Sequence, residues 1–448
     1  MRQLEKEFNA KSRRGIQKFG AWKTCSAGYY IRVWGFQMKI IQFIALAAGI
    51  LAGTFSGLAQ TWTQSNAPTN NWFATGSSAD GMRLIASGNF GAIYLSTNYG
   101  AAWFVASNAP VDRNWARVAA NSATGNTLAA ADFISGIWLS HDFGATWSLQ
   151  DIPDEGGWTA VAMSKDGNKI IAGRAFDAVA FAASDPPGPG LIYISGDSGV
   201  TWVTNNLPAQ NWVSVASSAD GHVLMAAARV YEIILGTPVA IDYPGPIFVS
   251  TNFGSTWLTN NVPLEKWYSI QASADGSQLL AGTAAGLIYS STDYGLNWST
   301  NNPGSETNGC SALALSADGA KWLAAYPDGN IFYSTNQGAF WFNEASPTHS
   351  WSGMCMSADG NRLTGVVGNG GIFTAYSDPS PTLGLRSFTN SPTVSWIQPA
   401  TNFILQQSSD MLHWTDVTNS PVLNLTNLQN QVTLPAPAGN VFYRLKTP

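Results

Sequence analysis

Two short motifs alternate along the sequence, and this repetition constrains the fold more than any other feature. The first motif reads Ser-Ala-Asp-Gly or a close variant, and its copies begin at Ser78, Ser122, Ser164, Ser218, Ser273, Ser316 and Ser357. Asp-Gly between two apolar runs is a strong signal for a β-hairpin, so we call these segments the hairpin turns. A unit that recurs in this way predicts a repeat architecture, in which neighbouring units bury a shared core.

The second motif reads Ser-x-Asp/Asn-x-Gly-x-x-Trp, and its copies begin at Ser96, Ser140, Ser195, Ser250, Ser291 and Ser334. Each copy lies between two short β-branched or aromatic runs, which places it in a turn between strands. The Asp or Asn side chain can accept hydrogen bonds from backbone N–H groups two residues on, and Gly supplies the positive φ of such a turn. We call these segments the box turns.

Together the two motifs predict a unit of four strands. The first strand of each unit begins near a Trp, except in the sixth unit, where Cys310 takes that place. The sequence contains seven hairpin turns but only six box turns. Residues 61–68 resemble the fourth strand of a unit, although the first three strands of a unit do not precede them. These counts predict an all-β fold: a seven-bladed β-propeller over residues 60–378, closed by an N-terminal strand in the last blade. Radial repetition leaves only short, protected sheet edges.

The box turns resemble the Asp-box, or bacterial neuraminidase, repeat of sialidases, xyloglucan-active glycosidases, sortilin-type receptors and photosystem II assembly-factor propellers. The resemblance covers residues 61–378 and implies a sialidase-like fold. It says little about activity, because in these families the box is a turn remote from the catalytic centre. The sialidase catalytic motif is not matched, since the first unit has no Arg-Ile-Pro segment.

The N-terminal region has no repeat character. Met38 and Lys39 precede an apolar run that ends in small residues before Gln60, which is the pattern of a signal peptide over residues 38–59. Residues 1–37 are then a mis-called extension, and the mature protein is secreted or held in the envelope of a bacterium, with no membrane span. The alternative is an uncleaved anchor, since about twenty apolar residues can cross a bilayer.

Charge and composition exclude several classes of function. Residues 60–448 carry 13 Lys and Arg against 25 Asp and Glu, a net charge of −12. This acidic field disfavours a nucleic-acid partner. The four His show no metal-ligand spacing and no Gly-rich phosphate loop occurs, so we expect no metal and no cofactor. Cys310 and Cys355 are interpreted as buried small apolar residues.

Insertions point to the candidate site. The Trp residues of successive box turns are 44, 55, 55, 41 and 43 residues apart, so two adjacent units carry extra residues, at 174–190 and 229–246. These insertions and the linkers between units fall on one side of the predicted propeller, which we call the loop face. Longer loops often carry function. Arginines there could clamp a carboxylate or sugar hydroxyls, and tyrosines could stack on a sugar ring. The candidate ligand-binding residues are Arg113, Glu155, Arg174, Asp177, Asp185, Arg229, Tyr231, Glu232, Asp242 and Tyr243.

The repeat stops after a linker at residues 379–384. Residues 385–448 resemble small C-terminal β-sandwich modules of secreted bacterial proteins, through Leu405-Gln406-Gln407-Ser408 and Phe442-Tyr443-Arg444-Leu445, which implies an Ig-like or fibronectin-like sandwich. The sequence as a whole favours a monomeric, non-enzymatic propeller that binds a glycan or protein ligand on the loop face. The alternatives are a polysaccharide-active glycoside hydrolase that uses two loop carboxylates, and a structural envelope component.

Overall fold

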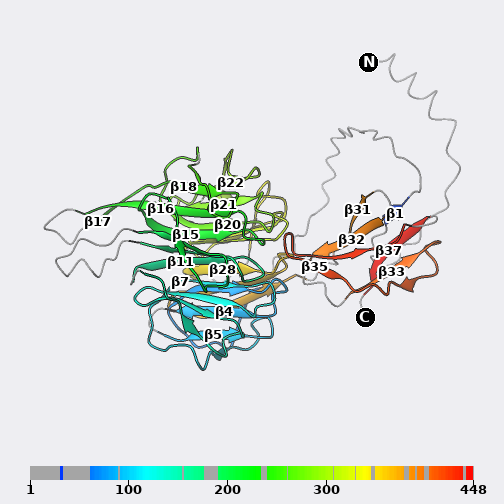
Figure 1. Cartoon of the computed structure of the whole chain (residues 1–448), viewed down its shortest axis with the longest axis horizontal. Helices are drawn as coiled ribbons and strands as arrows, with labels where there is room; N and C mark the ends of the chain where they lie inside the picture. Colours follow the sequence, from blue (N-terminus) through cyan, green and yellow to red (C-terminus); the bar gives the residue numbers. More distant parts are fainter. Residues whose placement is uncertain are drawn as a thin grey trace, which may run out of the picture.

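The chain folds almost entirely into antiparallel β-strands. The computed structural model describes residues 31–33 and 61–446, except for 89–90, 154–155, 176–189, 234–239, 260, 306, 328, 345–348, 378–382, 389–390, 398–402 and 437–439. Within these residues the single helical segment is the 3-10 turn η2 (Pro303–Ser305). Figure 1 shows two bodies, a larger one coloured from blue to yellow and a smaller one coloured from orange to red apart from one short dark-blue strand. The predicted all-β class is confirmed.

The larger body contains seven antiparallel sheets within the described residues; six are built from strands that follow one another along the chain, and the seventh includes a strand from before the first sheet. In chain order the strands are β3 (Trp72–Ser77), β4 (Leu84–Gly88), β5 (Ile93–Ser96), β6 (Phe104–Val105); β7 (Trp115–Asn121), β8 (Leu128–Asp132), β9 (Gly136–Ser140), β10 (Ser148–Leu149); β11 (Trp158–Met163), β12 (Ile170–Arg174), β13 (Ile192–Ser195), β14 (Val203–Thr204); β15 (Asn211–Ser217), β16 (Leu224–Ile233), β18 (Ile247–Ser250), β19 (Leu258–Thr259); β20 (Trp267–Ala272), β21 (Leu279–Thr283), β22 (Ile288–Ser291), β23 (Ser299–Asn301); β24 (Ala312–Leu315), β25 (Trp322–Ala325), β26 (Ile331–Ser334), β27 (Phe342–Asn343); and β28 (Trp351–Met356), β29 (Arg362–Val367), β30 (Ile372–Tyr376) with β2 (Thr63–Gln64).

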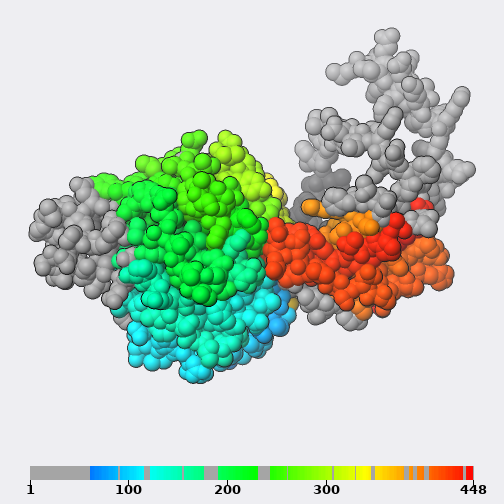
Figure 2. Space-filling view, in the orientation of Figure 1, coloured from blue at the N-terminus to red at the C-terminus, as the bar shows by residue number. Residues whose placement is uncertain are grey.

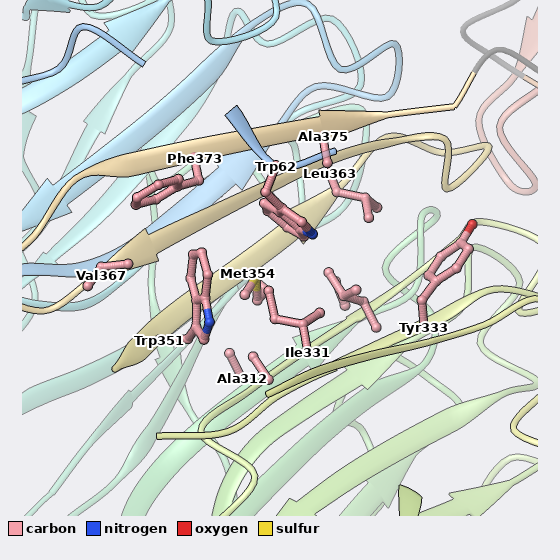
Figure 3. Close-up of a cluster of buried hydrophobic side chains, with 13 residues drawn as sticks. Trp62, Ala312, Ile331, Tyr333, Trp351, Met354, Leu363, Val367, Phe373 and Ala375 are labelled. Atoms are coloured by element: carbon pink, nitrogen blue, oxygen red, sulfur yellow. The ribbon is translucent and has the colours of Figure 1, made fainter. Parts of the chain in front are cut away.

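The ends of the larger body meet in one sheet. Thr63 and Gln64 of β2 pair with Thr374 and Phe373 of β30, so a strand from the start of the larger body lies beside the last strands of the repeat. Next to it, Trp62 packs against Trp351 and Phe373 in a buried cluster shared with the preceding sheet (Figure 3). Antiparallel pairing and apolar burial therefore join the two ends of the repeat.

The hairpin turns form a closed circle of backbone hydrogen bonds, which we call the turn ring. The N–H of the second residue in each turn donates to the carbonyl of the same residue in the next turn, at 2.7–2.9 Å, and the seventh donates to the first. A circle of this kind requires the sheets to radiate from one centre, so the larger body is a β-propeller. The ring residues are Ala79, Ala123, Lys165, Ala219, Ala274, Ala317 and Ala358.

A buried Trp at the start of most first strands connects neighbouring sheets. Trp212 and Trp267 donate their indole N–H groups to the carbonyls of Gly190 and Gly245, at 3.1 and 2.7 Å, and both side chains are fully buried. In the sixth sheet the small Cys310 leaves this space open. Tyr326, which directly follows β25, fills it, and its hydroxyl donates to the carbonyl of Gly286 at 3.1 Å.

The box turns are held by their own Ser and Asp or Asn side chains. In the first box turn the Gly100 N–H donates to Ser96 Oγ at 3.0 Å, and the Ala102 N–H donates to Asn98 Oδ1 at 2.8 Å. The acceptor therefore reaches four residues on, where the sequence suggested two. Tyr99, which precedes the glycine, also has a positive φ of 61°. Two successive residues with positive φ, Tyr99 and Gly100, tighten the turn. The Asn98 side chain then faces the N–H of Ala102 near the end of the motif.

The smaller body consists of two four-stranded sheets within the described residues. One contains β31 (Gly384–Phe388), β32 (Ser391–Ile397), β36 (Gln429–Thr433) and β35 (Val422–Asn424), and the other contains β1 (Ile31–Val33), β37 (Val441–Lys446), β33 (Ile404–Ser408) and β34 (Thr415–Asp416). Both contribute to one apolar core that includes Val394, Trp396, Leu405 and Tyr443.

Candidate functional site

A cavity of about 520 Å³ lies at the centre of the propeller. Its walls come mainly from the first strands β3, β11, β15, β20, β24 and β28. At one end the lining includes Gly309, Pro327 and Ser350, which lie just before or after strands at the loop face, and at the other end it includes Lys165 of the turn ring. The cavity thus runs from the loop face to the hairpin turns.

The cavity lining is apolar and hydroxylic, with one basic side chain. Valine, leucine, methionine and alanine alternate with serines and Thr75, and Lys165 supplies the basic group. Among the lining residues that the structure describes, none is Asp or Glu. The cavity wall therefore does not supply the pair of carboxylates that glycoside hydrolysis requires.

Lys165 and Cys355 lie toward the hairpin-turn end of the cavity. Burial lowers the pKa of Lys165, with a smaller opposing effect from Cys355, and burial raises the pKa of Cys355 to about 11. The Cys355 sulfur is 3.5 Å from the hydroxyl of Thr75. Cys310 is fully buried as expected, whereas Cys355 is only half-buried because it faces the cavity. The sequence already distinguished Lys165, because the other six hairpin turns carry Ala at the equivalent position.

Arg229 lies at the loop-face end, where two sheets meet. Its Nε donates to the carbonyl of Trp267 at 2.8 Å, and its guanidinium carbon lies 4.6 Å from the centre of the Tyr268 ring. Tyr268 is itself part of the cavity lining and remains 37% exposed. The pair forms an aromatic and cationic margin of the cavity, in a geometry suited to a cation–π contact.

The other two candidate arginines have structural contacts. Arg174 is buried, and its Nε donates to the carbonyl of Gly156 at 3.1 Å, which supports the linker before β11. Arg113 is half-exposed; it lies 3.8 Å from Asp132 Oδ2 and 5.9 Å from the centre of the Trp138 ring. These contacts place Arg113 and Arg174 beside different sheets from Arg229. The three guanidinium groups therefore have no neighbour in common among the contacts given above.

The second insertion is a two-stranded extension of the fourth sheet. β16 continues past the sheet and pairs with β17 (Ala240–Tyr243), with Val230 opposite Tyr243 and Tyr231 opposite Asp242. Tyr243 is 39% exposed. Figure 1 shows β17 projecting on the side of the propeller away from the smaller body. The side chains of Tyr231, Glu232 and Asp242 lie outside the described part, as do the whole residues Glu155, Asp177 and Asp185.

The described residues contain neither a cluster of metal-ligating side chains nor a membrane-spanning helix. No group of three or more His, Cys, Asp or Glu side chains is close enough to hold a metal ion within that part of the chain. No helix there has the length and apolar character needed to cross a bilayer. The apolar run at residues 40–59 lies outside the described residues.

Comparison with solved structures identifies the class of fold. YCF48 from Cyanidioschyzon merolae superimposes with a TM-score of 0.51 at 14% identity, over 70% of this chain and 98% of the other. A structure of YCF48 bound to D1 peptide superimposes with a TM-score of 0.52 at 16% identity, over 72% of this chain and 97% of the other. No family model and no curated protein matches the sequence. The chain therefore has a β-propeller fold similar to that of YCF48, and the predicted propeller is confirmed.

Proposed function

We propose that this chain is an exported, non-enzymatic binding protein: a seven-bladed propeller with a C-terminal β-sandwich module, which takes its ligand on the loop face. The observation that carries the proposal is the central cavity, which reaches the loop face at the margin formed by Arg229 and Tyr268 and has no carboxylate in its described lining. A concave site lined by apolar and hydroxyl side chains is suited to binding. Export rests on the signal-peptide pattern at residues 38–59.

A protein or peptide ligand is the first candidate. The YCF48 structure bound to D1 peptide shows that a propeller of similar fold can hold a peptide. The projecting β16–β17 extension adds exposed apolar surface for a protein partner, since Val230 is 41% and Tyr243 39% exposed. A glycan is the second candidate, favoured by the exposed rings of Tyr243 and Tyr268, because aromatic rings with a polar end suit partly wet interfaces.

The hydrolase alternative needs two carboxylates about 5 to 10 Å apart on either side of a glycosidic bond. The cavity wall offers none among its described residues. The remaining candidates are Asp177, Asp185, Glu232 and Asp242 on the two insertions, whose side chains lie outside the described residues. The described lining of the cavity therefore favours binding over cleavage.

The test combines a glycan array, a peptide array and a hydrolysis screen on residues 60–448. We expect binding to glycan or peptide without turnover, and at least a tenfold loss of affinity in the double variant Arg229→Met, Tyr268→Ala. The matched control is Arg113→Met, a loop-face arginine on another sheet, which should bind as the unmodified chain does. Release of reducing sugar, or equal affinity in the double variant and the control, would refute the proposal.

A further inference from the structure

The turn ring leaves a small apolar socket at one end of the cavity. Its backbone N–H groups and carbonyls bond to one another around the circle, so they do not have to be hydrated along the axis. Six of the seven ring residues are alanines, and each is at most 8% exposed. The seventh, Lys165, lines the cavity, which shows that the ring lies at its floor.

One side chain of the smaller body occupies this socket. Leu428 lies in the turn between β35 and β36, is only 3% exposed, and packs in a single cluster with the six ring alanines. Leu423 and Ile397 from the same sheet pack around it and remain partly exposed. In Figure 1 the β35 end of the smaller body lies against the propeller, and Figure 2 shows the atoms of the two bodies in contact there.

Leu428 has a left-handed backbone conformation, with a φ of 53°, which residues with a Cβ rarely adopt. A nearby leucine in the same turn, Leu425, is 37% exposed and has no positive φ. Burial in the ring therefore distinguishes Leu428 from its neighbour.

We infer that the smaller body is a plug: Leu428 seals the turn ring, so that the central cavity is a blind pocket entered from the loop face alone. This assigns a role to the C-terminal module and does not depend on which ligand the loop face binds. It also explains the placement of the module on the side away from β17, because a cap at the loop face would block the site (Figure 1).

Cys355 reports on the floor of the cavity. It lines the cavity three residues before Ala358 of the ring, whereas Cys310 is fully buried in the core and reports global unfolding. The full chain is treated with N-ethylmaleimide at constant pH, and labelling of each cysteine is followed by peptide mapping. The test variant is Leu428→Gly, in which glycine accepts the left-handed φ while the plugging side chain is removed. Leu425→Gly is the matched control.

We expect Leu428→Gly to raise the labelling rate of Cys355 at least fivefold, with Cys310 unchanged and Leu425→Gly within twofold of the unmodified chain. An unchanged rate at Cys355 would overturn the inference, because removal of Leu428 would then open no second route into the cavity besides the loop face. Equal increases at Cys355 and Cys310 would overturn it as well, since Leu428 would then hold the whole propeller together instead of closing one end.

Discussion

The sixth sheet offers a sharp test of how the propeller is held together. There, Tyr326 replaces the Trp that joins neighbouring sheets elsewhere, and its buried hydroxyl donates to the carbonyl of Gly286. The substitution Tyr326→Phe removes this hydroxyl and keeps the ring, including its edge-on contact with Phe332 at 5.8 Å. The buried carbonyl then loses its donor, which costs about 1 to 2 kcal/mol. We expect a fall in melting temperature of about 2 to 4 °C.

The assay is urea unfolding followed by tryptophan fluorescence, with melting temperature measured by circular dichroism. Tyr376→Phe is the control, because Tyr376 is 70% exposed and its substitution should leave stability unchanged. A double variant, Cys310→Trp with Tyr326→Thr, recreates the pair Trp267 and Thr283 that faces across β20 and β21. The free energy of unfolding of this double variant should exceed the value obtained by adding the effects of the two single substitutions, by about 0.5 to 3 kcal/mol.

Two results would refute this reasoning. Equal stability of Tyr326→Phe and the unmodified chain would show that the hydroxyl contributes nothing. Strict additivity in the double variant would show that Cys310 and Tyr326 do not share one space. Either outcome would mean that the sixth sheet is joined to its neighbour by other contacts.

Three further predictions concern the turns and the floor of the cavity. Burial lowers the pKa of Lys165 in the folded chain below its ordinary 10.5. Between the lowered pKa and 10.5 the unfolded chain binds more protons than the folded chain, so the free energy of unfolding rises with pH in that interval. Urea unfolding at several pH values should therefore show the unmodified chain gaining stability relative to Lys165→Met toward pH 10; a constant difference would contradict this. In three box turns, side-chain hydrogen bonds hold the pKa of Asp142, Asp197 and Asp293 below the ordinary 3.8. The contribution of these carboxylates to folding stability is therefore present above pH 3.8 and is lost as the pH falls through the lowered pKa. Acid titration should show that any stability advantage over the triple Asp→Asn variant shrinks as the pH falls below 3.8; an advantage that stays constant over that acidic range would argue against the assignment. Finally, Gly254→Ala should cost about 1 to 3 kcal/mol in urea unfolding, because φ is +74° and the added methyl would overlap the Ile194 side chain; unchanged stability would show that the turn can relax.

Local chemistry explains why the turns were predictable from the sequence. Asp-Gly, Ser-x-Asp and the flanking alternation of apolar residues act within a few residues of one another, so each copy in the sequence corresponds to a turn in the structure. The same holds for the first strands, whose leading Trp is followed by a strand in each of six sheets. Repetition of a local unit then predicted the propeller. The reach of the box acceptor was missed by two residues, because it depends on two consecutive left-handed residues.

The candidate site was less predictable, because it depends on contacts between distant parts of the chain. Loop length drew attention to Arg174, yet burial against Gly156 makes it a support for the backbone. Arg229 alone among the described arginines of the site lies beside the cavity, and its partner Tyr268 belongs to the next sheet. Lys165 deviated from the repeat, but nothing in the sequence indicated that position two of each turn faces a shared axis.

The sequence by itself determined the repeating turns, the strands between them and the all-β propeller that they build, because these follow from interactions between neighbours along the chain. Only the tertiary structure decided where the cavity lies, which side chains line it, and how the smaller body meets the propeller. The turn ring joins successive turns that are about 40 to 55 residues apart and closes by pairing Ala358 with Ala79, and docking adds Leu428 from outside the repeat. Such contacts depend on the shape that the whole chain adopts, which no local pattern encodes.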